Sequence, residues 1–326
     1  MPAKGFASPR PGVELNFPDD HGAHREYRIE WWYLTANLED SQGRPLGAQW
    51  TLFRTALAPG EGGGWSDPQL YMGHAALTSS TDHVFAERLG RGGTGQAGVW
   101  VSPFHAFIDD WSMKSLATSD ADPLSHLELF AAGSDFSYRL TARAGRPLIL
   151  HGDRGYSLKS ASGQASYYYS QPFYEVTGEI ELKGQRTRVS GQAWLDREWS
   201  SQPLAADQTG WDWFSLHFDN GEKLMGFSVR DSAKGFSSGT WISRDGRGIP
   251  LSRNSLKAFP LAYTRVEGRR IPTRWRIVLE ERGVDVTLRA INPNAFMKTS
   301  APYWEGPVTF SGTHSGRGYL EMTGYE

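Results

Sequence analysis

Residues 274–290 read RWRIVLEERGVDVTLRA, a segment in which apolar and polar side chains alternate over two short runs. In the first run the apolar side chains are Trp275, Ile277 and Leu279, and in the second they are Val284, Val286, Leu288 and Ala290. Side chains two residues apart share one face of a β-strand, so each run predicts a half-buried strand. Glu281-Arg-Gly283 between the runs predicts a turn, and the segment therefore predicts an antiparallel hairpin.

The same pattern recurs along the whole chain of 326 residues. Further candidate strands span residues 27–38, 46–57, 135–143, 174–182, 187–196, 211–219, 222–230, 237–243, 256–266, 303–311 and 318–324. Asp219-Asn-Gly221 lies between two of them and is typical of a tight hairpin turn. Aromatic residues make up 13% of the chain and there are 37 glycines, which favour strands and turns respectively. The sequence predicts an all-β barrel or sandwich with few short helices.

A weak internal repeat indicates two similar barrels in tandem. Trp31 precedes an acidic turn and Arg54, and Trp211 precedes Asp219-Asn-Gly221 and Arg230 in the same order. We therefore predict one barrel over residues 21–200 and a second over residues 201–326, with the boundary in the loop 200–209. Residues 1–20 contain several prolines and glycines with little apolar pattern, and they are interpreted as a tether or strap.

Charge and cysteine content exclude several classes of protein. The chain has 34 basic and 36 acidic residues, a net charge of −2, which excludes a dedicated nucleic-acid or acidic-membrane binder. Without cysteine there is no disulfide framework, thiolate metal site or cysteine nucleophile. No uncharged apolar run approaches the ~20 residues of a membrane helix, so no membrane span is predicted.

Two motifs match known catalytic or metal sites in residue type but lack the surrounding elements that such sites need. Gly235-Phe-Ser-Ser-Gly239 matches the nucleophile elbow of serine hydrolases, but its flanks are predicted strands and no helix follows the serine. His21, His24 and Glu26 have the identity of metal ligands, but no third and fourth ligand is evident nearby. We predict no metal and no cofactor.

Three segments combine aromatic and ionisable residues densely: Glu30-Trp-Trp-Tyr33, Trp194-Leu-Asp-Arg-Glu-Trp199 and Trp211-Asp-Trp213, with His217 four residues further on. On a strand, Trp194, Asp196 and Glu198 share one face. A carboxyl group among tryptophan rings has a raised pKa and can act as a general acid near neutral pH. The alternative is that Asp196, Arg197 and Glu198 form structural ion pairs and that the tryptophans are core.

The chain resembles the AttH-like proteins, a lipocalin-like family that also includes carotenoid hydratases. The resemblance covers nearly the whole chain and rests on Tyr27-Arg-Ile-Glu-Trp-Trp-Tyr33, Gly73-His-Ala75, Tyr167-Tyr-Tyr-Ser170, Gly191-Gln-Ala-Trp-Leu-Asp-Arg-Glu-Trp199, Gly210-Trp-Asp-Trp-Phe214, Tyr303-Trp-Glu-Gly306 and Gly318-Tyr-Leu-Glu321. It implies two antiparallel calycin-type barrels and a deep apolar cavity. In the hydratase branch, acid catalysis adds water to an isolated double bond.

The resemblance and the segments together give a set of candidate residues. The candidate catalytic residues are Asp196, Glu198 and His217, and the candidate ligand-binding residues are Trp31, Trp32, Tyr33, His74, Tyr169, Trp194, Trp199, Trp211 and Trp213. The residues interpreted as structural ion pairs are Glu30, Arg54, Arg197 and Arg230. Arg197 stands where the hydratases tend to have histidine, and arginine cannot shuttle protons, so hydration of a carotenoid itself is not expected.

Two functions remain open at this point. In the first, the protein is an enzyme that hydrates, hydrolyses or isomerises a hydrophobic small molecule, with Asp196 as the acid. In the second, the same cavity carries a lipid of the cell envelope without turnover. The resemblance implies a periplasmic or secreted protein whose signal peptide has been removed, although a cytoplasmic location stays open. No nucleic-acid partner is expected, and a monomer is one possible state.

Overall fold

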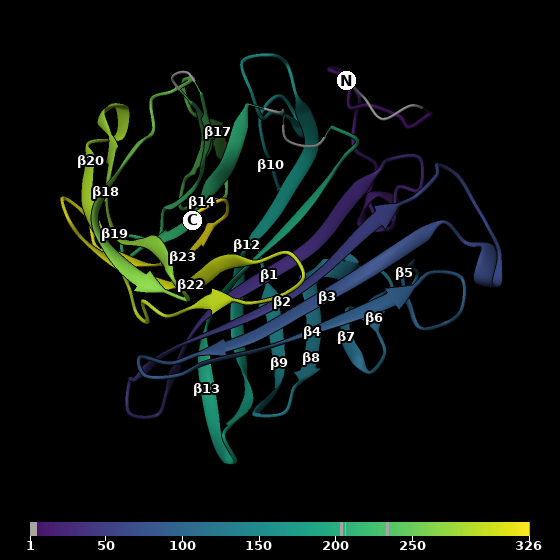
Figure 1. Ribbon diagram of the computed structural model, residues 1–326, viewed down its shortest axis with the longest axis horizontal. Helices are drawn as coiled ribbons and strands as arrows, with labels where there is room; N and C mark the ends of the chain where they lie inside the picture. The colour runs from purple at the N-terminus through teal and green to yellow at the C-terminus, as the bar shows by residue number, and fades with distance from the viewer. Residues whose placement is uncertain (1–4, 203–204, 206, 233–234, 326) are drawn as a thin grey trace.

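The computed structural model describes residues 5–202, 205, 207–232 and 235–325, which form two antiparallel β-sheets (Figure 1). The helices in this part of the chain are four 3-10 turns, η1 (Asp19–His21), η2 (Gly64–Ser66), η3 (Pro123–Ser125) and η4 (Glu280–Arg282). None of the described helices is long and apolar enough to cross a membrane. The prediction of an all-β fold with few short helices is confirmed.

The first sheet has the strand order β4-β3-β2-β1-β13-β12-β9-β8-β7-β6-β5, with β10 and β11 pairing beside β12. Its strands are β1 (Ile29–Asp40), β2 (Pro45–Ala56), β3 (Gln69–Thr78), β4 (His83–Arg91), β5 (Ala97–Val101), β6 (Phe104–Ile108), β7 (Trp111–Ser115), β8 (His126–Ala132), β9 (Phe136–Ala144), β10 (Ile149–Leu150), β11 (Tyr156–Leu158), β12 (Ala165–Leu182) and β13 (Gln185–Ser200). This sheet curls into a nearly closed barrel.

The second sheet has the strand order β17-β16-β15-β14-β23-β22-β20-β19-β18, with β21 beside β22. Its strands are β14 (Gln208–Phe218), β15 (Lys223–Asp231), β16 (Phe236–Ile242), β17 (Gly248–Pro250), β18 (Lys257–Val266), β19 (Arg269–Leu279), β20 (Val284–Ala290), β21 (Phe296–Met297), β22 (Tyr303–Gly312) and β23 (Gly316–Met322). It forms a half-barrel, so the two units of the tandem differ in closure.

The segment 274–290 forms the hairpin that its alternation predicts. β19 and β20 pair antiparallel, with Trp275 opposite Leu288 and Ile277 opposite Val286. All four of these side chains are buried in the core of the half-barrel. The turn η4 ends at Gly283, whose φ of +64° lies in the left-handed region that glycine adopts readily.

The N-terminal segment lies against the first barrel. The backbone nitrogen of Arg10 donates to the Tyr167 hydroxyl (2.9 Å), and Leu15 and Phe17 pack against the barrel core. Phe17 also stacks on the ring of His21. These contacts belong to the predicted tether or strap, of which residues 1–4 lie outside the described residues. Residues 203–204 and 206 of the predicted boundary loop 200–209 also lie outside them.

β13 is the strand that places the candidate site. It lies between β1 and β12. On β1, Trp32 lies opposite Arg197 of β13 and Tyr33 lies opposite Asp196 of β13. Successive side chains of a strand point to opposite faces. Arg197 and Trp199 therefore point into the first barrel, while Asp196 and Glu198 point toward the second sheet.

The two sheets touch closely at Gly47 on β2. A Cβ added to Gly47 would lie 2.5 Å from the Tyr319 hydroxyl and 2.7 Å from a ring carbon of Pro307, both on the second sheet. We therefore expect Gly47→Ala to lower the free energy of unfolding by about 1–3 kcal/mol, because overpacking forces neighbouring groups apart. The measurement is urea unfolding followed by tryptophan fluorescence.

The matched control is Gly145→Ala, because a Cβ added to Gly145 meets no atom within 4 Å. Equal stability of the two variants would show that the sheets do not depend on this close contact.

Candidate functional site

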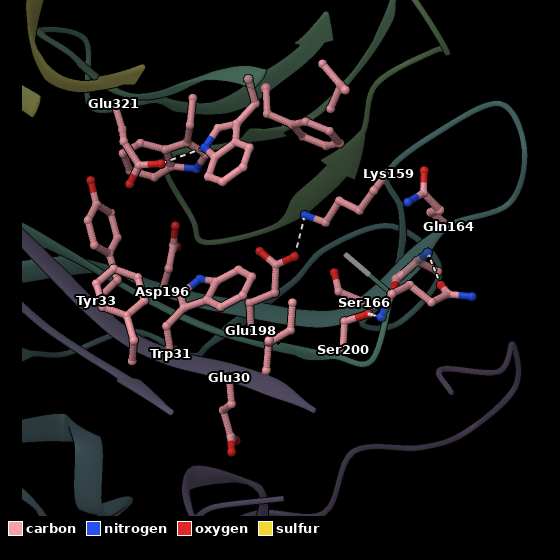
Figure 2. A pocket seen from close by; sticks show the side chains of 18 of the residues that line it. Glu30, Trp31, Tyr33, Lys159, Gln164, Ser166, Asp196, Glu198, Ser200 and Glu321 are labelled. Carbon is pink, nitrogen blue, oxygen red and sulfur yellow. Dashed lines mark hydrogen bonds and ion pairs between the residues drawn. The ribbon is translucent and has the colours of Figure 1, made fainter. Parts of the chain in front are cut away.

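A cavity of about 410 Å³ lies between the two sheets. The first sheet contributes Trp31 and Tyr33 from β1 and Asp196 and Glu198 from β13, as Figure 2 shows. The second sheet contributes Trp211, Trp213, Phe227, Val229 and Glu321. The walls are therefore aromatic and aliphatic with a small number of converging carboxyl groups, which is the usual composition of a small-molecule site.

Asp196 is buried in this wall and accepts hydrogen bonds from three side chains. Its Oδ1 accepts from the Trp194 indole nitrogen (2.6 Å) and from the Ser170 hydroxyl, and its Oδ2 accepts from the Tyr168 hydroxyl (2.7 Å). The Tyr168 hydroxyl in turn accepts from the Trp213 indole (3.1 Å), which links Asp196 to the second sheet.

No described basic side chain forms an ion pair with Asp196. Burial raises the pKa of its carboxyl group to about 7, although the hydrogen bonds from Ser170, Tyr168 and Trp194 oppose the shift. An aspartic acid that titrates near neutral pH can exist as the acid or as the carboxylate under ordinary conditions, and this is what a general acid requires.

Glu198 shares the face of Asp196 but has a different environment. The Lys159 ammonium lies 2.8 Å from its Oε1 and also sits 4.3 Å from the ring centroid of Tyr168 and 4.5 Å from that of Phe227. In Figure 2 a dashed line joins Lys159 to Glu198 and marks this ion pair. Two carboxyl groups on one strand face thus differ in that only Glu198 has a described cationic partner.

The second sheet carries two further buried carboxyl groups that the sequence did not predict as site residues, and of these Glu321 lines the cavity whereas Glu305 lies outside its lining. Burial raises the pKa of Glu321 to about 7, and the Trp211 indole donates to its Oε1 (2.6 Å). Burial and the neighbouring Glu321 raise the pKa of Glu305 well above its usual range, and the Tyr33 hydroxyl donates to its Oε1 (2.7 Å). Both residues occur in motifs that carry the family resemblance, which is the only sequence signal that could have singled them out.

Six of the predicted site residues, three aromatic and three charged, lie on the other face of the first sheet, inside the barrel: Trp32, Trp199, Tyr169, Glu30, Arg54 and Arg197. Arg197 lies 2.7 Å from Glu30 and 3.9 Å from the Trp32 ring centroid, and Arg54 lies 2.9 Å from Glu30. Although burial opposes ionisation, His24, Arg197 and Arg54 hold the pKa of Glu30 well below its usual range. Figure 2 shows the Glu30 side chain pointing away from the cavity.

His21 and His24, which precede β1, also lie in the interior of the first barrel. His24 stacks on Trp199 with ring centroids 3.8 Å apart, and its Nδ1 lies 2.6 Å from Glu30 Oε1. His21 Nδ1 lies 2.6 Å from the Tyr169 hydroxyl. Among the described residues, no group of three or more metal-ligating side chains is placed to hold a metal ion.

Three further candidates lie away from the cavity. His74 Nδ1 lies 3.0 Å from the Tyr303 hydroxyl and its Nε2 3.0 Å from Glu87. His217 Nδ1 lies 2.8 Å from the Lys223 ammonium, and burial and that charge hold the pKa of His217 well below its usual range. Arg230 pairs with Asp212 at 2.6 Å. The structure therefore does not bring His74 or His217 to Asp196.

The fold and the site together define a lipocalin-like all-β protein with an aromatic, carboxyl-bearing cavity between its two sheets. The AttH-like family model matches residues 8–325, and the chain belongs to the AttH-like family.

Solved structures agree with this assignment. A protein from Nitrosomonas europaea described as an AttH is 32% identical, with a TM-score of 0.86 over 98% of this chain and 100% of that chain. Kievitone hydratase from Nectria haematococca is 15% identical, with a TM-score of 0.73 over 98% of this chain and 95% of that chain, a likeness of fold. None of the curated proteins compared with this chain matches it.

The buried ion pair of Arg197 can be tested by stability. We expect Arg197→Leu to lower the free energy of unfolding by about 3–5 kcal/mol, because the buried Glu30 carboxylate loses its ion pair with the Arg197 guanidinium. Arg188→Leu on the same strand is the control, since the Arg188 side chain is 90% exposed and exposed ion pairs contribute little. Equal loss in both variants would contradict a special role for the buried pair.

The raised pKa of Asp196 predicts a pH-dependent stability. The folded carboxyl binds its proton more tightly than the unfolded one, so this stability is present below about pH 4 and is lost as the pH rises to 7. Asp196→Asn removes the group. We therefore expect the unfolding free energy of the variant, relative to wild type, to rise by about 3 kcal/mol between pH 5 and pH 8.

The measurement is urea unfolding of both proteins at the two pH values. A difference that stays constant between pH 5 and pH 8 would mean that Asp196 is already ionised at pH 5.

Proposed function

We propose that this protein is an enzyme that adds water to a carbon–carbon double bond of an apolar small molecule held between its two sheets. The observation that carries the proposal is Asp196, a buried carboxyl group with a pKa of about 7 and no described cationic partner, in the wall of an aromatic cavity. An acid of this kind can protonate a weakly basic substrate carbon, which water alone does very slowly.

The hydrogen bonds of Asp196 indicate where the transferred proton sits. Oδ1 already accepts from Trp194 and Ser170, whereas Oδ2 accepts from Tyr168 alone, so Oδ2 is the oxygen that carries the acidic proton. After transfer to a substrate carbon, the three donors stabilise the carboxylate that remains. Burial raises the pKa of Asp196 and the three hydrogen bonds lower it, so that the pKa lies at about 7.

The ring walls suit the charge that develops next. Protonation of the double bond leaves a carbocation, and Trp31, Trp211 and Trp213 line the cavity, where the negative charge of an indole ring face stabilises a cation. Water then adds through its oxygen to the cationic carbon and loses a proton to Glu198, which is paired with Lys159. Glu198 then releases this proton to water and Asp196 takes one up, so both carboxyl groups return to their starting states and the sum of the steps is addition of one water molecule.

The comparisons support the class of reaction only through the fold. One structure of similar fold is kievitone hydratase, and the family that the sequence resembles includes carotenoid hydratases. A carrier would have the same cavity and would need no residue that titrates near pH 7. The raised pKa values of Asp196 and Glu321 favour the enzyme.

The first experiment identifies what the cavity binds and whether it changes. The protein is incubated with a panel of acyclic terpenes and unsaturated fatty acids, and bound and released species are identified by native and extraction mass spectrometry. We expect wild-type protein to release a product heavier than one panel member by one water molecule. Asp196→Asn is expected to bind the same molecule with nearly unchanged affinity and to form less than about 1% of the product, since it lacks the acid.

The control is Asp212→Asn, which removes another buried carboxyl group with a raised pKa that pairs with Arg230 and does not line the cavity. This variant should retain turnover if it folds, as judged by circular dichroism. Binding of a panel member without any hydrated product from wild-type protein would support the carrier instead.

A further inference from the structure

The edge strand β18 exposes three large apolar side chains within five residues, and its register with β19 shifts between Pro260 and Tyr263. Phe259, Leu261 and Tyr263 are 47%, 47% and 44% exposed, and we call these three residues the β18 strip. Phe259 lies opposite Arg276 of β19, whose neighbours Trp275 and Ile277 are buried in the core. Phe259 therefore points outward, away from the half-barrel core. In Figure 1, β18 lies with β19 and β20 on the left side of the molecule, away from the first sheet.

The strands beside the β18 strip carry an excess of positive charge. Between Lys257 and Ala290 there are eight basic and four acidic residues, although the whole chain has a net charge of −2. Four of the arginines, Arg265, Arg270, Arg274 and Arg289, form no ion pair with any described residue. The net charge of the whole chain hides this local concentration of positive charge, so the exclusion of an acidic-membrane binder from that net charge does not hold for this face.

These four arginines stand in two cross-strand pairs. Arg265 lies directly opposite Arg270, and Arg274 lies directly opposite Arg289. Like charges directly opposite on neighbouring strands destabilise a sheet. Arg270 also lies over the Tyr263 ring at 4.1 Å, which ties the positive charge to the apolar strip. These arginine pairs lower the stability of the sheet, and binding of an anionic partner would offset their repulsion.

We propose that this face docks on an anionic lipid bilayer, with the β18 strip at the boundary between headgroups and acyl chains and the arginines against the headgroups. Aromatic side chains favour that boundary, and basic side chains are attracted to anionic lipid. A second copy of the chain is a poorer occupant. A symmetric dimer through this face would bring the arginines of one copy toward those of the other.

This inference goes beyond the proposed function and does not depend on it. A peripheral docking surface needs no membrane-spanning segment. It would place the protein where apolar molecules such as those proposed for the cavity are dissolved. Vesicle binding is measured without any substrate, so its failure leaves the proposed reaction untouched, and failure of the reaction leaves the docking surface untouched.

The test is flotation of the full-length protein with vesicles of phosphatidylcholine alone or of phosphatidylcholine with 30% phosphatidylglycerol. We expect binding to the anionic vesicles at low salt, little binding to neutral vesicles, and release from anionic vesicles in 0.5 M NaCl as the charges are screened. Equal binding to both vesicle types, or no binding at low salt, would overturn the proposal.

Two sets of variants locate the surface. The triple variant Phe259→Ser, Leu261→Ser, Tyr263→Ser should lose at least about tenfold in partitioning, since buried apolar area and charge both contribute to interfacial binding. The matched control Leu57→Ser, Trp65→Ser removes two exposed apolar side chains elsewhere and should bind as wild type does. Loss of binding in the control but not in the triple variant would move the surface to the loop after β2.

Charge variants separate docking from a structural role. Neutralising one arginine that lies at the lipid surface should weaken partitioning by about fivefold. Arg289→Gln should do so and should also raise the unfolding midpoint slightly, because it removes a like-charge pair. A lowered midpoint with unchanged partitioning would show that Arg289 is structural. Conversion of a wild-type dimer to a monomer by the triple variant, in light scattering without vesicles, would assign the strip to a second copy and overturn the bilayer.

Discussion

The buried ion pair between Arg197 and Glu30 is the interaction on which the two-sided character of β13 depends. The side chains of both residues are fully buried, and the guanidinium also donates to the Trp31 and Gly22 carbonyl oxygens at 2.7 Å. These contacts hold the arginine inside the first barrel. The next side chain on the strand, Asp196, therefore faces the second sheet with no arginine to neutralise it, and the cavity receives a carboxyl group that can hold a proton.

Burial alone does not decide what a carboxyl group does in this protein. Glu30 and Asp196 are buried to a similar degree on paired strands, yet the pKa of Glu30 is lowered and that of Asp196 is raised to about 7. The difference lies in their partners, which are two guanidinium groups and His24 in one case and three neutral donors in the other. Partner choice therefore decides the direction in which the pKa of a buried carboxyl group shifts in this protein.

Local periodicity predicted most of the fold but only part of the site. The alternation in 274–290 predicted β19 and β20, and the alternation in Trp194–Trp199 placed Asp196 and Glu198 on one face. It could not show that Glu321 of the second sheet lines the same cavity as Asp196, or that Trp213 reaches Tyr168 across the gap between the sheets, because non-local contacts leave no trace in a local pattern. His217 shares a strand face with Trp213, but it lies four residues further along β14. Its Nδ1 therefore contacts the Lys223 ammonium and not Asp196.

The position of the cavity follows from how the first barrel is filled. A barrel of this type can hold a small ligand in its interior, but here the interior contains a continuous apolar core together with the Glu30, Arg54 and Arg197 cluster. The described cavity instead uses the outer face of β1 and β13, which would be exposed if the second sheet were absent. The half-barrel supplies the opposite wall with Trp211, Trp213 and Glu321, so both units are needed to exclude water from Asp196 and to keep its pKa near 7. The cavity thus belongs to neither sheet alone, since residues of both sheets line it.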